Sequence, residues 1–324
     1  MCLAIVWHSL HSNQTIEYMD RIKLKRYLTN PLRIFLKPWL ILAPYIKNDE
    51  LFLRGRYLFQ MGKPLHLNPP RTFNEKLQWL KLYDRNPKYT VMVDKYAVKE
   101  YVANTIGKQY VIPLLAVWDN VDDIDTTSLP DKFVLKTTNG GGGSSVFICK
   151  CKKEFRLENT KQQLLSSSVG AKGNFYVRAR EWPYKDVKYR IIAEQYLETT
   201  GDLCDYKVHV FNGEPKLILV CQNRYNESGL TEDFFDEKWN RLKLRRPSHP
   251  NSGLPVPRPD CLPELLDVSR KLSKGIPFVR VDFYIVNNHI YFGELTFYPA
   301  TGMHKFIPES WDVKMGEWLN LNHK

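Results

Sequence analysis

Long hydrophobic runs are missing from this 324-residue sequence, so no segment resembles a helix that crosses a membrane. The nearest candidate, residues 34–46, is interrupted by Lys37, Pro38 and Pro44. The first residues also lack the basic leader and small-residue cleavage pattern of a secretory signal. We therefore expect a cytoplasmic protein, in contact with the inner face of the membrane at most.

Cysteine is scarce and poorly placed for a metal site or a disulfide framework. The six cysteines include no CxxC pair, and no second pair accompanies Cys149 and Cys151 to complete a zinc site. We expect reduced, mostly buried thiols. The HExxH and GxSxG motifs are absent as well, which argues against the zinc and serine hydrolases that carry them.

Acidic residues are outnumbered, because 47 Lys and Arg stand against 35 Asp and Glu, a formal charge of +12. The hydrophobic content of 43% and the charged content of 25% are ordinary for a globular protein and exclude a disordered or fibrous chain. A positive surplus suits acidic acceptors and nucleic acid alike. No RRM, KH or helix-turn-helix signature occurs, so we do not expect a nucleic-acid partner.

The order of the predicted elements indicates an α+β fold. Helical spacing of apolar residues predicts helices over residues 73–83, 94–105, 155–168 and 262–273. Alternating segments predict mostly antiparallel strands over residues 132–136, 145–150, 189–197, 205–211, 216–221, 277–286 and 290–296. The proline-rich residues 247–263 predict an irregular loop.

Residues 21–47 interleave basic side chains with Leu, Ile, Phe and Trp, a composition that can lay a helix on an anionic membrane. Pro31, Pro38 and Pro44 interrupt a continuous amphipathic helix and favour a helical segment packed on its own domain. Both interpretations stay open. The membrane interpretation uses Arg21, Lys23, Lys25, Arg26, Arg33, Leu36, Lys37, Trp39, Leu40 and Leu42.

Four consecutive glycines follow a predicted strand that ends at Lys136. Because such a run costs backbone entropy, close approach of the main chain to another group would explain it. Its N–H groups can bind phosphate oxygens while Lys136 adds a positive charge, although a flexible hairpin turn is the alternative. The loop comprises Gly140, Gly141, Gly142, Gly143, Ser144 and Ser145.

Two carboxylates face each other in a predicted hairpin. If residues 287–289 form a three-residue loop, Asp282 lies opposite Glu294. The same register places Arg280 opposite Thr296, with all four side chains on one face. Adjacent carboxylates repel unless a cation bridges them, and oxygen ligands from strands suit Mg²⁺. A solvated face, or a two-residue turn that moves Glu294 to the other face, is the alternative.

A third group of polar residues lies on the predicted strands 189–197 and 205–211. Glu194 and Gln195 precede Leu197, and Asp205 begins the next strand. Side-chain and main-chain groups of this kind can hydrogen-bond an adenine and a ribose. Ordinary alternation on a half-buried strand explains Glu194 equally well.

In this order, the features resemble those of ATP-grasp enzymes, and more narrowly the TupA-like branch, which is named for teichuronopeptide biosynthesis. The resemblance covers about residues 70–320. It rests on the segments TFNEKLQWLKLYDRNPKY, VDKYAVKEYV, IPLLAVWDN, FVLKTTNGGGG, DYKVHVFNGEP and RVDFYIVNNHIYFGELTFYPATG.

The resemblance implies that ATP and Mg²⁺ are the cofactors. Lys95 and Lys136 would bind the nucleotide phosphates, under a lid formed by residues 140–145. Arg280 would stabilise the transferred phosphoryl group or the tetrahedral intermediate that follows. Adenine and ribose would be held by Glu194, Gln195, Leu197 and Asp205. Mg²⁺ would be held by Asp282, Glu294 and Thr296, the last in place of the usual Asn.

The implied fold has two α+β subdomains whose antiparallel sheets hold ATP between them. They would span about residues 95–197 and 198–324 of a catalytic domain 71–324, after a helical lead-in of residues 1–70. The implied activity joins an amino acid or amine to an acidic sugar or glycan in surface polysaccharide biosynthesis, through an acylphosphate. A glycosyltransferase or kinase of the same biosynthesis, or a basic binding module without activity, is the alternative.

Overall fold

The computed structural model describes residues 27–140, 145–168, 175–199, 201–224 and 229–321. The chain divides into two compact units, Met1–Leu65 and His66–Lys324. Among the described residues, no helix is long and apolar enough to cross a membrane.

The described part of the first unit, residues 27–65, is helical, as the sequence predicts. It contains a 3₁₀ helix Pro31–Phe35, α2 (Leu36–Ile41) and α3 (Asp49–Met61). The side chain of Asn48 caps α3 by accepting a hydrogen bond from Leu51 N, and Gly62 ends it in the left-handed conformation.

Trp39 packs inside this unit. Its ring contacts those of Phe52 and Phe59 at centroid distances of 6.3 and 5.6 Å, and its Nε1 donates to the Phe52 carbonyl (3.1 Å). Several apolar side chains are exposed nevertheless: Ile34, Phe35, Ile41, Leu42 and Tyr45. The basic residues Arg21, Lys23, Lys25 and Arg26 lie outside the described residues. Membrane contact therefore stays a prediction.

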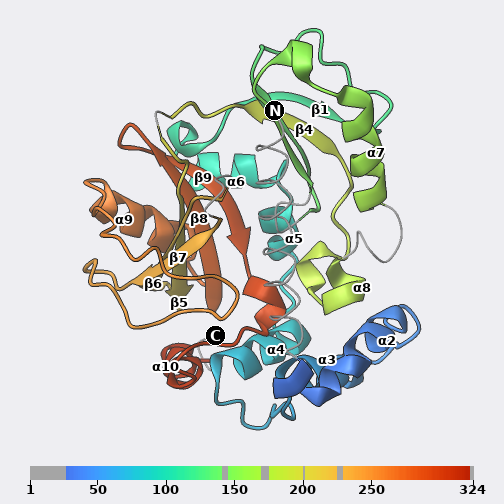
Figure 1. The fold of residues 1–324 in the computed structure, drawn as a ribbon, viewed down its shortest axis with the longest axis vertical. Helices are drawn as coiled ribbons and strands as arrows, with labels where there is room; N and C mark the ends of the chain where they lie inside the picture. The colour runs from blue at the N-terminus through green and yellow to red at the C-terminus, as the bar shows by residue number, and fades with distance from the viewer. Residues whose placement is uncertain (1–26, 141–144, 169–174, 200, 225–228, 322–324) are drawn as a thin grey trace, which may run out of the picture. The chain divides into compact units, whose positions relative to one another are not determined.

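The second unit alternates helices with two groups of strands (Figure 1). Its α-helices are α4 (Phe73–Tyr83), α5 (Lys88–Val93), α6 (Val98–Thr105), α7 (Leu157–Ser168), α8 (Phe175–Ala179), α9 (Leu262–Leu272) and α10 (Ser310–Trp318). Its described residues also contain the 3₁₀ helices Lys108–Tyr110, Lys152–Glu154, Trp182–Tyr184 and Pro299–Gly302. Its strands are β1 (Leu114–Trp118), β2 (Phe133–Thr137), β3 (Val146–Cys149), β4 (Ile191–Gln195), β5 (Asp205–Phe211), β6 (Glu214–Gln222), β7 (Thr231–Phe235), β8 (Phe278–Val286) and β9 (His289–Thr296).

The strands form two antiparallel sheets, a small one of order β1-β4-β2-β3 and a large one of order β7-β6-β5-β8-β9. Each sheet has its own buried apolar cluster, around Phe133 and Leu135 in the small sheet and around Val281 and Phe283 in the large one. The α+β class with two antiparallel sheets is therefore confirmed.

The helix expected over residues 94–105 is wrong in its first turn. The chain forms a turn there, because the Asp94 carboxylate accepts hydrogen bonds from Tyr96 N (2.8 Å) and Ala97 N (3.2 Å), and α6 begins only at Val98. The other predicted elements agree with the observed ones to within about two residues at each end. No strand was predicted from the sequence at the positions of β1 and β7.

Helices α10 and α4 approach closely at Gly316. A Cβ placed on Gly316 would lie 2.9 Å from Thr72 C and 3.0 Å from Phe73 N, and would also collide with the Arg71 carbonyl. These are backbone atoms at the start of α4, so no side chain can rotate away. The glycine thus permits the contact that fixes α4 against the C-terminal helix.

We expect the substitution Gly316→Ala to destabilise the second unit by about 1–3 kcal/mol, the usual cost of overpacking. The sign of the change in the free energy of unfolding is informative, because replacing Gly by Ala inside a helix otherwise stabilises the helix by about 1 kcal/mol. Urea unfolding followed by circular dichroism measures the change. Gly201→Ala is the matched control, since a Cβ there meets nothing within 4 Å. Equal stability of the two variants would contradict the close approach.

Candidate active site

The β8–β9 hairpin closes with a two-residue turn, so the predicted three-residue loop is wrong. Asn287 and Asn288 have φ angles of 51° and 62°, and Val286 lies opposite His289. Two consecutive left-handed residues form the turn whose twist matches an antiparallel hairpin, and Asn tolerates that conformation better than most residues.

A β-bulge at Gly293 restores the predicted register nearer the site. Strand β9 has one extra residue there, and beyond it Asp282 lies opposite Glu294. Arg280 lies opposite Thr296 in the same way. Without the extra residue, the two-residue turn would have moved Glu294 to the other face of the sheet. The predicted pairing of the carboxylates is therefore confirmed.

Asp282 is buried in a cluster of charged groups. Arg280 Nε and Nη2 donate to its two carboxylate oxygens (2.6 and 2.7 Å), and Lys207 Nζ donates to Oδ2 (2.5 Å). Arg280 Nη2 also reaches Glu294 Oε1 (3.2 Å) and Thr296 Oγ1 (3.1 Å). Burial alone would lower the pKa of Arg280, but Asp282 and Glu294 raise it above its ordinary value. Arg280 is therefore charged.

The oxygen donors of this cluster are of the kind that Mg²⁺ prefers, and in the structure Arg280 and Lys207 donate hydrogen bonds to them. Asp282, Glu294 and Thr296 offer two carboxylates and a hydroxyl, and Mg²⁺ is usually held by one or two carboxylates plus substrate phosphate oxygens. Among the described residues, no group of three or more His, Cys, Asp or Glu side chains is placed to hold a metal ion. Magnesium binding by these residues stays a prediction.

Lys95 connects the glycine loop to the carboxylates. Its backbone N donates to the Thr138 carbonyl just after β2 (3.1 Å), and its Nζ donates to the Gly140 carbonyl. The same Nζ lies 3.7 Å from Glu294 Oε2 on the large sheet. Burial lowers the pKa of Lys95, and Glu294 opposes that shift. One ammonium group thus contacts both halves of the predicted site.

Gly140 could not be replaced by a larger residue without a rearrangement. A Cβ there would collide with the side chains of Ser145 and Thr137. The backbones of these two residues are joined at the base of the loop, where Thr137 N donates to the Ser145 carbonyl (3.3 Å). Gly141, Gly142, Gly143 and Ser144 lie outside the described residues. The lid stays a prediction.

Glu194 lies between two lysines. Its carboxylate oxygens are 2.5 Å from Lys136 Nζ and 2.6 Å from Lys99 Nζ. Burial alone would raise the pKa of Glu194, but Lys136 and Lys99 together lower it below its ordinary value. Lys99 was not predicted as a site residue from the sequence. Its spacing of four residues from Lys95, close to one helical turn, was the available signal. The adenine contact of Glu194 stays a prediction, and the geometry gives it a contact with Lys136.

The three remaining predicted residues differ in exposure. Asp205 is buried, pairs with Arg224, and lies 3.5 Å from Lys207 Nζ. Gln195 is exposed at the end of β4, and its backbone N donates to the Pro113 carbonyl (3.0 Å). Leu197 is buried. The roles of these residues in binding adenine and ribose stay predictions.

The family model of the TupA-like ATP-grasp proteins matches residues 75–320. The chain belongs to the TupA-like ATP-grasp family. The match covers every predicted site residue. No curated protein matches the chain at a significant level.

Solved structures to which this TupA-like chain is similar include the following three. D-alanine–D-alanine ligase from Bacillus anthracis, complexed with ATP, has 13% identity and a TM-score of 0.37 over 70% of this chain and 57% of that chain. N5-carboxyaminoimidazole synthetase from Staphylococcus aureus, complexed with ADP, has 16% identity and a TM-score of 0.41 over 70% of this chain and 52% of that chain. The ATP-grasp ligase PsnB, complexed with minimal precursor, Mg and ADP, has 12% identity and a TM-score of 0.37 over 69% of this chain and 57% of that chain. The chain spans less than two thirds of each of these proteins.

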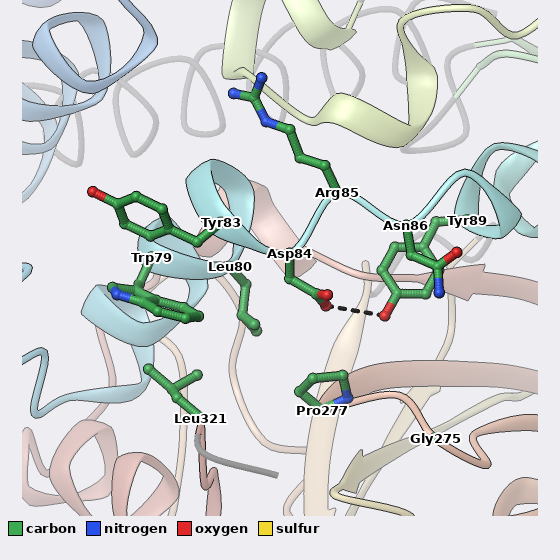
Figure 2. Close-up of a pocket in the computed structure, with 10 residues that line it drawn as sticks. All are labelled: Trp79, Leu80, Tyr83, Asp84, Arg85, Asn86, Tyr89, Gly275, Pro277 and Leu321. Atoms are coloured by element: carbon green, nitrogen blue, oxygen red, sulfur yellow. Dashed lines mark hydrogen bonds between the residues drawn. The ribbon is translucent and has the colours of Figure 1, made fainter. Parts of the chain in front are cut away.

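A pocket in the described part of the TupA-like chain lies apart from these residues. It has a volume of about 400 Å³ and is lined by the end of α4, the segment leading to α5 and residues just before β8. Figure 2 shows the Tyr89 hydroxyl bonded to Asp84 (3.0 Å) beside Pro277, while the Arg85 side chain points away from them. No predicted site residue lines this pocket.

Proposed function

We propose that this TupA-like ATP-grasp protein is an ATP-dependent carboxylate–amine ligase of surface polysaccharide biosynthesis, such as that of a capsule, an O-antigen or a teichuronopeptide. The observation that carries the proposal is the position of Lys95, which contacts both the first glycine of the loop and Glu294. A single polyanionic ligand at that point would meet the loop, the lysine and the paired carboxylates together. Magnesium-bound ATP has that chemistry.

Each charged group has a part in this proposal. Lys95 and Lys136 bind phosphate oxygens, and Arg280 stabilises the charge of the transferred phosphoryl group. Asp282 and Glu294 hold Mg²⁺, which would neutralise phosphate charge when bound. Phosphoryl transfer requires positioning and charge neutralisation and no protein nucleophile. The buried cationic cluster is suited to that task.

The proposed reaction has two steps. A carboxylate oxygen of the substrate attacks the γ-phosphorus of ATP, the bond to ADP breaks, and an acylphosphate forms. An amine nitrogen then attacks the acyl carbon, a C–N bond forms, phosphate leaves, and the amine loses its proton to solvent. The substrates are an acidic sugar or glycan and an amino acid or amine. The net charge of +12 would attract the acidic substrate.

The direct test is product analysis with the full chain. Purified protein with Mg²⁺-ATP, D-glucuronate or D-galacturonate, and a panel of amino acids should yield ADP and phosphate in equal amounts. Mass spectrometry should detect an amide whose mass equals the two substrates minus water. The matched control omits the amine and should form no amide.

Other products would identify the alternatives. A glycosyltransferase would release a nucleotide from a sugar nucleotide and leave ATP unchanged. A kinase would form ADP and a stable phosphorylated acceptor without any amine. A binding module would consume no nucleotide at all. Each of these results would contradict the ligase proposal.

A further inference from the structure

The helical segment of the first unit has two unlike faces. Its backbone is helical over residues 31–42, across the 3₁₀ helix and α2. At about 3.6 residues per turn, Trp39 and Ala43, which follows the segment, lie on one side of it. Ile34 and Ile41 are two turns apart and lie on the opposite side. Which side stays open depends on how the segment packs on the rest of its unit.

The side that carries Trp39 is fixed to α3, which lies next to α2 (Figure 1). The Trp39 indole lies against Gly55 of α3, where a Cβ would collide with the ring. Asn30, just before the segment, is buried and donates to the Phe59 carbonyl of α3 (2.9 Å). Ala43, just after it, is buried as well. Because the segment is held at its middle and at both ends, it cannot rotate to bury its other side.

The other side is apolar and exposed. Ile34, Ile41 and Leu42 are 59%, 64% and 49% exposed, and Tyr45, in the turn that follows, is 77% exposed. Tyr45 N donates to the Leu42 carbonyl (3.0 Å), which keeps this tyrosine beside the end of α2. We call these four side chains the outer face. Large apolar side chains that gather on an exposed face indicate a surface that binds a partner.

Positive charge accompanies the outer face. Lys37 and Lys47 are exposed, and Arg33 is half-buried about one turn before Lys37. Residues 27–47 contain no Asp or Glu, and the next acidic residue, Asp49, begins α3. A partner that covers the outer face should therefore combine an apolar interior with a negatively charged surface.

Two other occupants match this chemistry poorly. A second copy of the chain would bring the same cations to the contact, where like charges repel. Residues 1–26 hold four basic and two acidic side chains, so they are positively charged too. A bilayer with anionic lipids has negative headgroups at its surface and hydrocarbon directly beneath them.

We propose that the outer face docks this protein on an anionic phospholipid bilayer. Its four apolar side chains enter the boundary between headgroups and acyl chains, while Lys37 and Lys47 stay at the level of the headgroups. Trp39 and Leu40, which the sequence alone also indicates as membrane anchors, are half-buried within the unit and do not take part. Docking of this kind does not depend on the ligase activity.

The test is co-sedimentation of the full chain with lipid vesicles. One set of vesicles contains phosphatidylcholine alone, and the other contains about one third phosphatidylglycerol, which carries a negative charge. We expect the protein to bind the anionic vesicles at low salt and to bind them more weakly at high salt, because salt screens the attraction of Lys37 and Lys47. Binding to phosphatidylcholine alone should be much weaker.

Matched variants assign the contact to the outer face. Ile41→Ser with Leu42→Ser removes apolar side chains that are already exposed, and should weaken binding to anionic vesicles by about tenfold or more. Lys37→Gln should weaken it by about fivefold, which corresponds to about 1 kcal/mol for one cation near the surface. The controls Leu254→Ser and Lys274→Gln change exposed residues of the second unit and should leave binding unchanged. Melting followed by circular dichroism should be the same for all of these proteins.

Three results would overturn the proposal. The wild-type chain could bind neither kind of vesicle. The double variant could bind as tightly as the wild type, which would place the contact elsewhere, for example in residues 1–26. In analytical ultracentrifugation without lipid, the wild type could sediment as a dimer and the double variant as a monomer, which would make the outer face a contact between two copies of the chain.

Discussion

Replacing Asp282 by Asn, or Glu294 by Gln, is expected to reduce Mg²⁺-dependent ADP formation by about a thousandfold or more, because the developing phosphate charge then loses its counter-ion. Each variant keeps the side-chain shape and removes one negative charge from a face that already holds Arg280 and Lys207. The remaining cations repel Mg²⁺ more strongly than before. ADP release measured against Mg²⁺ concentration gives the effect.

Asp267→Asn is the matched control for these variants. Asp267 pairs with Lys271 at 2.7 Å on the exposed side of α9, with both side chains about half exposed (55%). An exposed pair of this kind contributes little to stability, so activity and melting temperature should stay at wild-type values. Wild-type ADP formation by both active-site variants would show that the carboxylates do not bind the metal.

The hairpin shows how far the sequence could predict the site. Counting residues from an assumed three-residue loop gave the pairing of Asp282 with Glu294, but the structure reaches it through a two-residue turn and the bulge at Gly293. The two changes in register cancel. A glycine within a strand is a signal for a bulge, and at Gly293 a Cβ would lie 3.0 Å from the Asp282 carbonyl.

Lys207 and Lys99 could not be predicted from local patterns. Lys207 reaches Asp282 only because β5 pairs with β8, more than seventy residues later in the chain. Lys99 reaches Glu194 across a similar separation. A lysine in sequence is most simply interpreted as a surface residue, and only the tertiary contact with a buried carboxylate changes that interpretation.

Strand β7 was missed for a related reason. Its sequence, TEDFF, has two acidic residues where a buried strand would normally be apolar. Glu232 and Asp233 are nevertheless buried, because Arg246 and Arg241 from the following segment neutralise them. Charge neutralisation by a distant segment thus overrides the propensity of the strand itself.

Removing the buried carboxylate at Glu194 should have the largest effect on stability. Glu194→Ala leaves the Lys136 and Lys99 ammonium groups buried without their common counter-charge, a change that typically costs about 3–5 kcal/mol. For a unit of this size, that loss lowers the melting temperature by about 6–20 °C. Differential scanning calorimetry at pH 7 measures it.

Glu198→Ala provides a closely matched control. Glu198 follows four residues later and pairs with Lys132 at 3.0 Å, but its side chain is 69% exposed and that of Lys132 is 42% exposed. Solvent screens this pair, so its loss should cost at most about 1 kcal/mol. A melting temperature equally unchanged in both variants would show that the Glu194 cluster is solvated and contributes no more than a surface ion pair.

The dependence on pH gives an independent check of the same cluster. The folded-state pKa of Glu194 lies below its ordinary value of 4.5, because Lys136 and Lys99 outweigh the effect of burial. The ionised carboxylate therefore contributes its full stabilisation above about pH 4.5 and loses it as the pH falls through the folded-state pKa. The stability difference between wild type and Glu194→Gln should be largest at neutral pH and shrink in acid. A difference that grows in acid would mean that burial dominates and that the lysines do not hold the carboxylate ionised.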